Sequence, residues 1–505
     1  MLWVGLHLPL LSLESFAATL VPPQLGQPVA LLQMHRVVAV DAVAAALGVQ
    51  SGMKQATAMA LAPTLVLGQA DPSRDAQALK AVAHAALAFT PAVSLDAQTS
   101  EAGSGVRLEV QASLRYFGGL AHLIERLLQA LQPLGHQVQW ATAPTALGAS
   151  LLARWRADQG PGPTSHDALR VLLDDAPLHL LQAGHEHAQA LQGMGLRTLG
   201  DLRRLPRAGL ARRFGPGLLL QLDRARGDAP DPHDWEELPE RFDSRLELFV
   251  RADTSEQLLA GARILLARLV AWARGRQGRV GRFELLMHHE PRHRQGADQP
   301  ACTVLPVALA EPSVDAAHLH LLLAERLGRL PLPAPALELS LRCDEALPGD
   351  APNGELFASR SGERLGLVRL LERLQARLGN DQVRCLSLVC DHRPERAAQS
   401  RPTQVLQSAL PSPVAAPTVL ARPVWLLPEP LALPEKAHQP WLDGQALLLV
   451  AGPERIETGW WDGALAARDY FIAQAADGAL VWIYRARLPL QAAGGEGWFL
   501  QGRFA

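Results

Sequence analysis

A short predicted strand at residues 106–110 has the surroundings of a two-metal catalytic site but lacks the paired acids at its start. Apolar residues alternate with polar ones along it, and this pattern predicts a strand that leads into a helix near Ser113. Acids at the upstream end of such a strand can hold two divalent cations for phosphoryl transfer. Here that end is Gly103, Ser104 and Gly105, and none of these side chains offers a charged oxygen to a hard cation.

The segment that contains this strand, LEVQASLRYFGG at 108–119, resembles the palm of the Y family of translesion DNA polymerases. That family's motif reads S-x-D-E-x-x-L-D before a polar turn and a helix. More specifically, the chain resembles a non-polymerising branch of the family found in bacterial mutagenesis cassettes. Further segments follow in the family's order and resemble the fingers (46–63), the thumb (193–206 and 213–227) and a tail peculiar to that branch (389–397, 422–430, 452–463, 468–473 and the last residues).

The resemblance implies an α+β multidomain protein with the right-hand architecture of a Y-family polymerase and a C-terminal β-rich extension. The acidic, proline-rich stretch at 228–240 predicts an exposed linker. The segment after it predicts strands and helices in a βαββαβ-like order. The expected parts are a palm (1–20 and 68–158), fingers (21–67), a thumb with a degraded helix-hairpin-helix (168–228), a little finger (241–345), a linker and clamp-binding region (346–440) and a β-rich interaction module (441–505).

Alignment with the palm motif leaves its pair of metal-binding acids broken in either of two registers. If Glu109 is set on the last acid of the motif, Ser104 and Gly105 fall on the Asp-Glu pair. A second register sets Asp96 on the Asp, and Ala97 then replaces the Glu. Both registers stay open from the sequence, and each removes at least one metal ligand.

Other positions that would hold metal or triphosphate also carry small or neutral residues. By the resemblance, Gly5 and His7 fall on the aspartates of the first strand, and Ala42 and Ala45 fall where a Tyr and an Arg would grip the triphosphate. Gly160 falls where a Lys before Pro would do the same. These coincident losses predict that nucleotide binding is absent, and that no metal or cofactor is required.

Glycine turns and arginines predict contacts with DNA phosphates in the thumb and the little finger. The stretch LQGMGLRTLGDLRRL resembles a helix-hairpin-helix, whose turn directs backbone N–H groups at a phosphate. Its upstream partner turn keeps one glycine only, so a plain helical packing unit with solvated arginines is the alternative. The expected DNA-binding residues are Gly193, Gly195, Arg197, Arg203, Arg204, Arg212 and Arg213 in the thumb, and Arg274, Arg276, Arg279 and Arg282 in the little finger.

A short apolar island after the little finger resembles peptides that bind a sliding clamp. Asn353, Leu356 and Phe357 match the pattern Q-x-x-L-F, with Asn in place of Gln. The same residues could instead begin the helix that the following leucine-rich sequence predicts. A second candidate peptide runs from Gln407 to Leu410.

The last 65 residues predict a small β module rich in aromatic side chains, which we expect to form its core. Two neighbouring residues on one strand point to opposite faces, so Trp460 and Trp461 cannot both be buried. At least one of them is expected to bind a protein partner.

Composition fits a folded protein of several domains. The chain has 505 residues, 48% hydrophobic content and a net charge of −2, and its mean hydropathy is +0.03. Its four cysteines show no C-x-x-C spacing, and Cys385 and Cys390 are expected in the core on one apolar strand. The apolar start lacks a charged leader and predicts a buried strand, and no run is long enough to span a bilayer. A cytoplasmic, nucleoid-associated protein is expected.

The resemblance implies a non-catalytic scaffold in SOS-induced translesion synthesis. Its expected partners are primer-template DNA, the sliding clamp, an error-prone C-family DNA polymerase and a RecA-like accessory protein. One alternative is an active translesion polymerase that uses displaced carboxylates at Asp96, Glu101 and Glu109. Another is a DNA-binding repair factor that does not contact the clamp.

Overall fold

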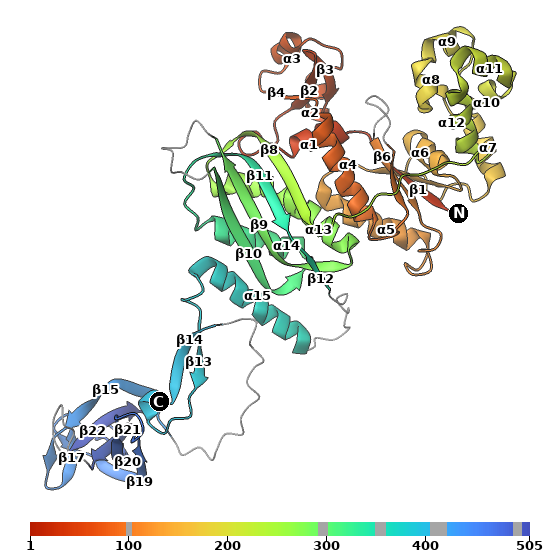
Figure 1. Cartoon of the computed structure of the whole chain (residues 1–505). Helices are drawn as coiled ribbons and strands as arrows, with labels where there is room; N and C mark the ends of the chain where they lie inside the picture. The colour runs from red at the N-terminus through yellow and green to blue at the C-terminus, as the bar shows by residue number, and fades with distance from the viewer. Residues whose placement is uncertain (97–103, 291–300, 349–359, 404–421, 488–496, 505) are drawn as a thin grey trace. The chain divides into compact units, whose positions relative to one another are not determined.

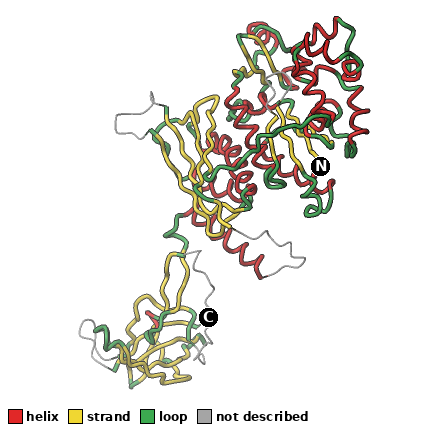
Figure 2. Tube along the Cα trace, turned by 45° about the vertical axis from the view of Figure 1, so that its right-hand side comes forward, coloured by secondary structure: helices red, strands yellow, loops and turns green. Residues whose placement is uncertain are grey.

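The computed structural model describes residues 1–96, 104–290, 301–348, 360–403, 422–487 and 497–504. The chain forms two compact units, Met1–Arg377 and Leu378–Ala505. Figure 1 shows their elements in chain order, and Figure 2 shows that the second unit consists mainly of strands and the loops that join them.

The segment expected to be the palm contains a four-stranded sheet in the order β5-β6-β1-β7. Its even-numbered residues on β1, such as Val4 and Leu6, face a core shared with α4 and α5, whereas odd-numbered residues such as Trp3 face α6. The sheet is therefore covered by helices on both faces around β1 (Figure 1). The elements are β1 (Trp3–Leu8), α1 (Leu11–Ala17), α4 (Pro72–Ala86), β5 (Val93–Asp96), β6 (Ser104–Glu109), α5 (Leu120–Leu131), η1 (Gln132–Leu134), β7 (Gln139–Ala143) and α6 (Ala146–Trp155).

Helix α5 begins at Leu120, later than the start near Ser113 that the sequence predicts. Residues 111–118 form turns after β6. Gly118 and Gly119 have φ values of 75° and 110°, and this left-handed backbone cannot continue a right-handed helix. The helix therefore starts directly after the second glycine.

The segment expected to be the fingers has a three-stranded sheet in the order β3-β2-β4 and a small core of its own. Strand β2 pairs antiparallel with β3 and parallel with β4. Asp41 caps α2 by accepting a hydrogen bond from the Ala44 N–H. The elements are β2 (Val29–Gln33), β3 (Arg36–Val40), α2 (Ala42–Ala46), α3 (Gln55–Leu61) and β4 (Val66–Gln69).

The segment expected to be the thumb is helical, and its buried leucines pack with α6 in one core. Thr198 and Asp201 form a reciprocal capping box at the start of α10, which fixes where that helix begins. The elements are α7 (His166–Asp174), η2 (Leu178–Leu180), α8 (Gln182–Glu186), α9 (Ala188–Gly193), α10 (Leu199–Arg203), α11 (Arg207–Phe214) and α12 (Pro216–Arg226).

The stretch at 228–240 is largely exposed, as its composition predicts, but it also packs against the palm sheet and is not a free linker. The Trp235 ring stacks on Trp3 with centroids 6.2 Å apart, and His233 lies 4.7 Å from the same Trp3 ring. The Glu236 N–H donates to the Val93 carbonyl at 2.9 Å, so the backbone continues the edge of the sheet beyond β5. Ring stacking on Trp3 and an available strand edge therefore hold this stretch against the sheet while most of its residues stay exposed.

The segment expected to be the little finger runs β8-α13-β9-β10-α14-β11, the βαββαβ order that the sequence predicts. Its sheet has the order β10-β9-β11-β8, with β12 paired to β9. Helix α13 packs on one face of this sheet and also contacts α4, so Ala267 and Ala271 join the palm core. The elements are β8 (Phe242–Ala252), α13 (Ser255–Gly275), β9 (Gly278–His289), β10 (Cys302–Ser313), α14 (Ala316–Leu327), β11 (Ala336–Cys343), β12 (Ala346–Pro348) and, after it, α15 (Arg360–Leu378).

The second unit contains a five-stranded antiparallel sheet in the order β15-β22-β21-β20-β19. Tyr470, Trp482, Tyr484 and Trp498 are buried, so the expected aromatic core is present in this unit. The elements are β13 (Arg384–Leu388), η4 (Pro394–Arg396), β14 (Ala398–Pro402), β15 (Trp425–Leu433), β16 (Glu435–Lys436), β17 (Gln439–Leu442), β18 (Gln445–Ala446), β19 (Leu448–Thr458), β20 (Ala466–Gln474), β21 (Leu480–Ala486) and β22 (Trp498–Arg503).

The expectation that Cys385 and Cys390 lie in the core is wrong. Both cysteines are exposed, because β13 pairs only with β14 in a two-stranded ribbon. A ribbon of two strands has no second layer of its own that could bury either face.

Candidate functional site

The positions where the resemblance expects catalytic acids lie side by side in the palm sheet. Asp96 on β5 pairs with Gly105 on β6, and Gly105 pairs in turn with His7 on β1. Residues that face each other across neighbouring strands point to the same face of a sheet. The side chains of Asp96 and His7 therefore project toward the face that carries α6, with no side chain between them at Gly105.

Asp96 is held by two arginines in a buried ion cluster. Its carboxylate accepts hydrogen bonds from Arg107 Nη2 at 2.7 Å and from Arg154 Nη2 at 2.8 Å. Arg107 also donates to Ser150 Oγ at 2.9 Å and lies 3.8 Å from Asp231. The Asp96 and Arg154 side chains are only 4% and 5% exposed. Each oxygen of this carboxylate is thus bonded to a guanidinium, and burial lowers the pKa of Arg154.

His7 is a buried, neutral neighbour of this cluster. Burial, with a smaller effect of the positive charge on Arg154, lowers the pKa of His7 to about 4. Among the described residues, the His7 Nδ1 atom has no hydrogen-bond partner. At neutral pH the imidazole is therefore uncharged and adds no counter-charge to Asp96.

The backbone of α6 fills the space that an acid at position 5 would need. A Cβ built on Gly5 would lie 2.5 Å from the carbonyl carbon of Ala149 and 2.7 Å from the Ser150 nitrogen. A Cβ on Gly105 would likewise lie 2.5 Å from the Leu6 carbonyl oxygen. An aspartate at either position is therefore excluded unless the backbone moves.

Asp96 and Glu109, the two described carboxylates of the alternative polymerase hypothesis, do not converge. Glu109 accepts hydrogen bonds from the backbone N–H of Gln111 at 3.1 Å and of Leu2 at 3.4 Å. It lies four residues along β6 from Gly105, the partner of Asp96, a separation of about 13 Å. Two cations in a catalytic pair lie only about 4 Å apart. Glu101 lies outside the described residues.

The residues expected at the triphosphate contacts lie on separate elements. Ala42 and Ala45 are exposed on α2, and Gly160 lies in the loop after α6 with a φ of 87°. None of the three offers a charged or hydrogen-bonding side chain. Within the described residues, no group of three or more His, Cys, Asp or Glu side chains is arranged to hold a metal ion.

The arginines expected to contact DNA in the thumb divide into two groups. Arg203 forms an ion pair with Asp174 at 3.1 Å, and Arg204 forms one with Asp201 at 3.4 Å. The second group is exposed and, in the part of the chain that the structure describes, forms no ion pair with an acid. It consists of Arg197 after the Gly193–Gly195 turn and of Arg212 and Arg213 in the last turn of α11.

Three of the four arginines expected in the little finger have internal partners. Arg274 donates to the Val314 carbonyl at 3.4 Å, and Arg276 donates to the Pro239 carbonyl at 3.2 Å. Arg282 pairs with Glu284 at 2.9 Å. Arg279, half-buried on β9, is the fourth member of this group.

The face of the little-finger sheet opposite α13 carries acids as well as arginines. Arg342 pairs with Asp243 at 3.1 Å, and Arg245 lies 3.8 Å from Glu338. This alternation of charge neutralises the face internally. A duplex backbone is bound by a surface with unpaired positive charge, and the exposed arginines of the thumb fit this requirement better than the little-finger sheet does.

Both expected clamp-binding peptides, Asn353 with Leu356 and Phe357, and the segment from Gln407 to Leu410, lie outside the described residues. The helix that follows the first peptide is present as α15.

Trp460 and Trp461 are both exposed, with 77% and 56% of their surface accessible. They lie in the loop between β19 and β20, and their rings meet edge to face with centroids 5.4 Å apart. Gly459 and Gly463 bracket them with φ values of 84° and 73°. The two tryptophans are thus displayed on a tight turn, where the alternation of a strand does not apply.

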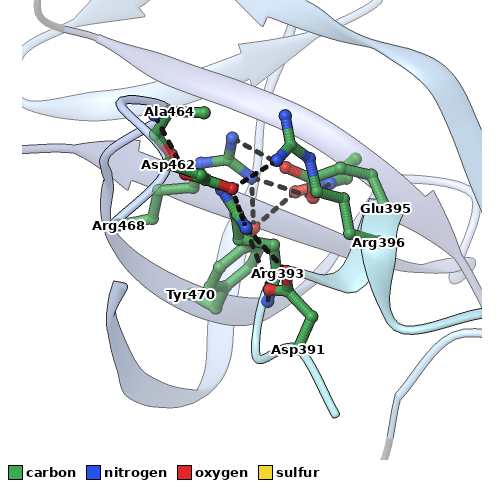
Figure 3. A network of polar contacts seen from close by, with 9 residues as sticks. Asp391, Arg393, Glu395, Arg396, Asp462, Ala464, Arg468 and Tyr470 are labelled. Carbon is green, nitrogen blue, oxygen red and sulfur yellow. Dashed lines mark hydrogen bonds and ion pairs between the residues drawn. The ribbon is translucent and has the colours of Figure 1, made fainter. Parts of the chain in front are cut away.

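A network of ion pairs fixes this turn to the segment around η4 (Figure 3). The buried Arg393 guanidinium donates to Asp462 at 2.7 and 3.0 Å, to Asp391 at 2.6 Å and to the Ala464 carbonyl at 3.0 Å. These hydrogen bonds from Arg393 lower the pKa of Asp391 and of Asp462 to about 2. The turn that carries the tryptophans is therefore pinned by a bidentate contact.

The same network continues into the sheet of the second unit (Figure 3). Glu395 pairs with Arg468 at 3.0 Å, and Arg468 donates to the Tyr470 hydroxyl at 3.0 Å. That hydroxyl donates to Gln501 Oε1 at 2.6 Å. Burial raises the pKa of Tyr470 well above its ordinary value.

Sequence reasoning missed Arg107 and Arg154 in the palm, and Arg393 with Asp462 in the tail. One signal was available for Arg107. It lies between the apolar Val106 and Leu108 on β6, so its side chain must point to the opposite face of the sheet, away from the α4–α5 core. The other partners lie 58 and 69 residues apart along the chain, and no local pattern indicates such pairs.

The helix-covered sheet, the helical segment after it and the βαββαβ lobe are the parts of the right-hand architecture that the resemblance implies, and a β-rich unit follows them. Among the described residues, a helix with the length and apolar character of a membrane span is not found. No family model matches the chain.

The particular relative indicated by the motifs is ImuB. The chain is 29% identical over 487 residues to the protein ImuB of Caulobacter vibrioides strain NA1000 / CB15N, covering 91% of this chain and 100% of that protein. ImuB of strain ATCC 19089 / CIP 103742 / CB 15 gives the same values. This similarity over nearly the whole of both proteins confirms the resemblance predicted from the motifs.

Solved structures of Y-family DNA polymerases also match. The insertion ternary complex of Dbh DNA polymerase has a TM-score of 0.38 and 16% identity, covering 69% of this chain and 100% of that chain. DinB from Sulfolobus solfataricus has a TM-score of 0.37 and 17% identity at the same coverage.

Proposed function

We propose that this chain is a non-catalytic, polymerase-like scaffold of translesion synthesis. In this role it binds primer-template DNA and the sliding clamp, and it recruits an error-prone C-family polymerase and a RecA-like accessory protein in the SOS response. DNA contacts come chiefly from the exposed thumb arginines and are made to phosphates. The proposal places the protein at the nucleoid.

One observation carries the loss of catalysis. Asp96, the acid that the structure places in the row of the expected catalytic residues, is saturated by Arg107 and Arg154. The neighbouring place at Gly5 is filled by the backbone of α6. A divalent cation at this site would have to displace two buried guanidinium groups and would find one carboxylate in return.

Primer extension with Mg²⁺ or Mn²⁺ tests this part of the proposal. We expect no incorporation above a no-enzyme control by the full chain, at concentrations where it binds the same primer-template. Incorporation that is abolished by Asp96→Ala would establish the alternative, an active polymerase with displaced carboxylates.

A pull-down on the sliding clamp tests the scaffold role separately. We expect Leu356→Ala with Phe357→Ala to abolish clamp binding and to leave DNA binding unchanged. The control variant replaces Leu410 by Ala in the second candidate peptide. If the Leu356→Ala, Phe357→Ala variant still binds the clamp and the Leu410→Ala variant does not, the clamp-binding peptide is the second candidate. If the unmodified chain does not bind the clamp, the alternative of a DNA-binding repair factor is favoured.

The exposed Trp460 and Trp461 support a protein-docking role for the second unit. A pair of exposed aromatic rings on a rigid turn loses little conformational entropy when it binds a partner. We expect Trp460→Ala with Trp461→Ala to lose one protein partner and to leave DNA binding unchanged. The expected partner is the C-family polymerase or the RecA-like protein, and separate pull-downs of each identify which.

A further inference from the structure

Helix α15 is firmly docked to the βαββαβ lobe along one face. Val368 and Ala376 are buried, and Ala376 belongs to the core of that lobe. Glu372, between them, lies 2.9 Å from His318 Nε2 on α14 and also accepts a hydrogen bond from the Ala310 N–H at the irregularity of β10. Residues at i, i+4 and i+8 lie on one side of a helix. This side therefore fixes the orientation of α15.

A second face of α15 carries leucines that are only partly covered. Leu367 and Leu370 are 47% and 53% exposed, and Leu371 and Leu374 are half-buried. Their spacings of three, four and seven residues place them in one stripe, as in the seam of a helix pair. A helix that has one apolar face docked and another half-exposed has a surface for one more helix.

Arginines outnumber acids along this part of the helix, although Arg369 pairs with Asp315 at 3.1 Å. Between residues 366 and 377 the helix has three arginines and a single acid, Glu372, which is buried against His318. Arg373 is half-exposed beside the leucine stripe, although it lies 3.3 Å from Glu325. Arg377 follows one turn later and is exposed, with no ion pair to any described residue.

We propose that the leucine stripe of α15 binds an amphipathic helix of a protein partner whose apolar seam is flanked by acidic residues. Leucines of the partner would pack between Leu367, Leu370 and Leu374, and its flanking carboxylates would meet Arg373 and Arg377. A second copy of this chain fits less well, because two copies would bring their arginines together along the same seam. The leucine stripe shares no residue with the DNA-binding, clamp-binding and tryptophan residues of the proposed function.

Two fluorescent synthetic helices test the proposal with the full chain. Both peptides carry leucine at the seam positions, and one has glutamate at the flanking positions whereas the other has lysine there. We expect fluorescence anisotropy to show at least tenfold tighter binding of the glutamate peptide. Leu370→Glu should weaken that binding at least tenfold, and Arg377→Glu should reverse the preference between the two peptides.

Leu220→Glu is the matched control, because Leu220 is a 42% exposed leucine on another helix, α12. It should leave peptide binding unchanged. Circular dichroism of each variant checks folding, and Leu370→Gln replaces the glutamate variant if that one unfolds. Equal binding of both peptides, absence of binding, or unchanged binding after the Leu370 substitution would overturn the proposal. A concentration-dependent dimer that Leu370→Glu abolishes would assign the stripe to a second copy instead.

Discussion

Replacement of Asp96 by Asn tests whether the buried ion cluster of Asp96, Arg107 and Arg154 stabilises the fold. The carboxylate is 4% exposed and accepts two charge-assisted hydrogen bonds, at 2.7 and 2.8 Å, from arginines that are 12% and 5% exposed. Asn offers one oxygen, and its amide N–H₂ would face the second guanidinium donor. The substitution therefore removes the negative charge to which both nearly buried guanidinium groups are bonded, and breaking a buried pair in this way costs about 3–5 kcal/mol.

Urea unfolding of the full chain, followed by circular dichroism, gives this free energy. Asp243→Asn is the control, because Asp243 pairs with Arg342 at 3.1 Å where the two side chains are 47% and 44% exposed. An exposed pair contributes about 0–1 kcal/mol. A loss at Asp96 no larger than the loss at Asp243 would refute the reasoning. A gain in stability would point to an acid kept for catalysis, since catalytic sites often hold groups at the expense of stability.

Four further outcomes are expected. Gly5→Ala should lower the free energy of unfolding by about 1–3 kcal/mol, because its Cβ collides with α6, and a neutral result in urea unfolding would contradict the packing. Arg393→Lys removes the two-nitrogen contact with Asp462 that holds the tryptophan turn. Backbone amides at 459–463 should therefore exchange hydrogen for deuterium faster, as measured by mass spectrometry, and unchanged exchange would show that the turn is stable without this contact. Arg212→Ala with Arg213→Ala should reduce the slope of log K against log salt for duplex DNA by about 2, whereas a preserved slope would place DNA elsewhere. The pKa of His7 is lowered from its ordinary value of 6.5 to about 4 in the folded chain. Between pH 6.5 and pH 4 the imidazole is therefore protonated in the unfolded chain but not in the folded chain, and the free energy of unfolding falls as the pH is lowered. This group alone should make unfolding about 2 kcal/mol easier at pH 5 than at pH 7, a loss that His7→Gln should remove in urea titrations at the two values.

The ion cluster ties the palm-like sheet to its neighbouring elements. Arg107 reaches from Asp96 toward Asp231, and Asp231 also lies 3.8 Å from Arg224 on α12. The cluster thus joins the sheet, the docked stretch at 228–240 and the thumb-like helices. The row of positions where the resemblance expects catalytic acids is thus part of the packing.

The sequence by itself determined which chemical groups are missing and in what order the elements follow. The absence of acids at Gly5, Ser104 and Gly105 needs no coordinates, and the βαββαβ order follows from apolar periodicity, which is a local property of the chain. Resemblance to known motifs, with their order along the chain, was enough to indicate ImuB. The predicted start of α5 was wrong because two glycines with left-handed backbone conformations interrupt the pattern.

Only the tertiary structure decided what replaced the missing groups. Asp96 meets Arg154 across 58 residues, and Arg393 meets Asp462 across 69 residues, and neither spacing leaves a periodic signal in the sequence. The same holds for the stretch at 228–240: its composition correctly predicts exposure, but nothing in it predicts the contact of Trp235 with Trp3 that holds the stretch to the sheet. Ion pairs and ring contacts of this kind depend on which surfaces folding brings together, and that is set by the packing of the whole unit and not by neighbours along the chain.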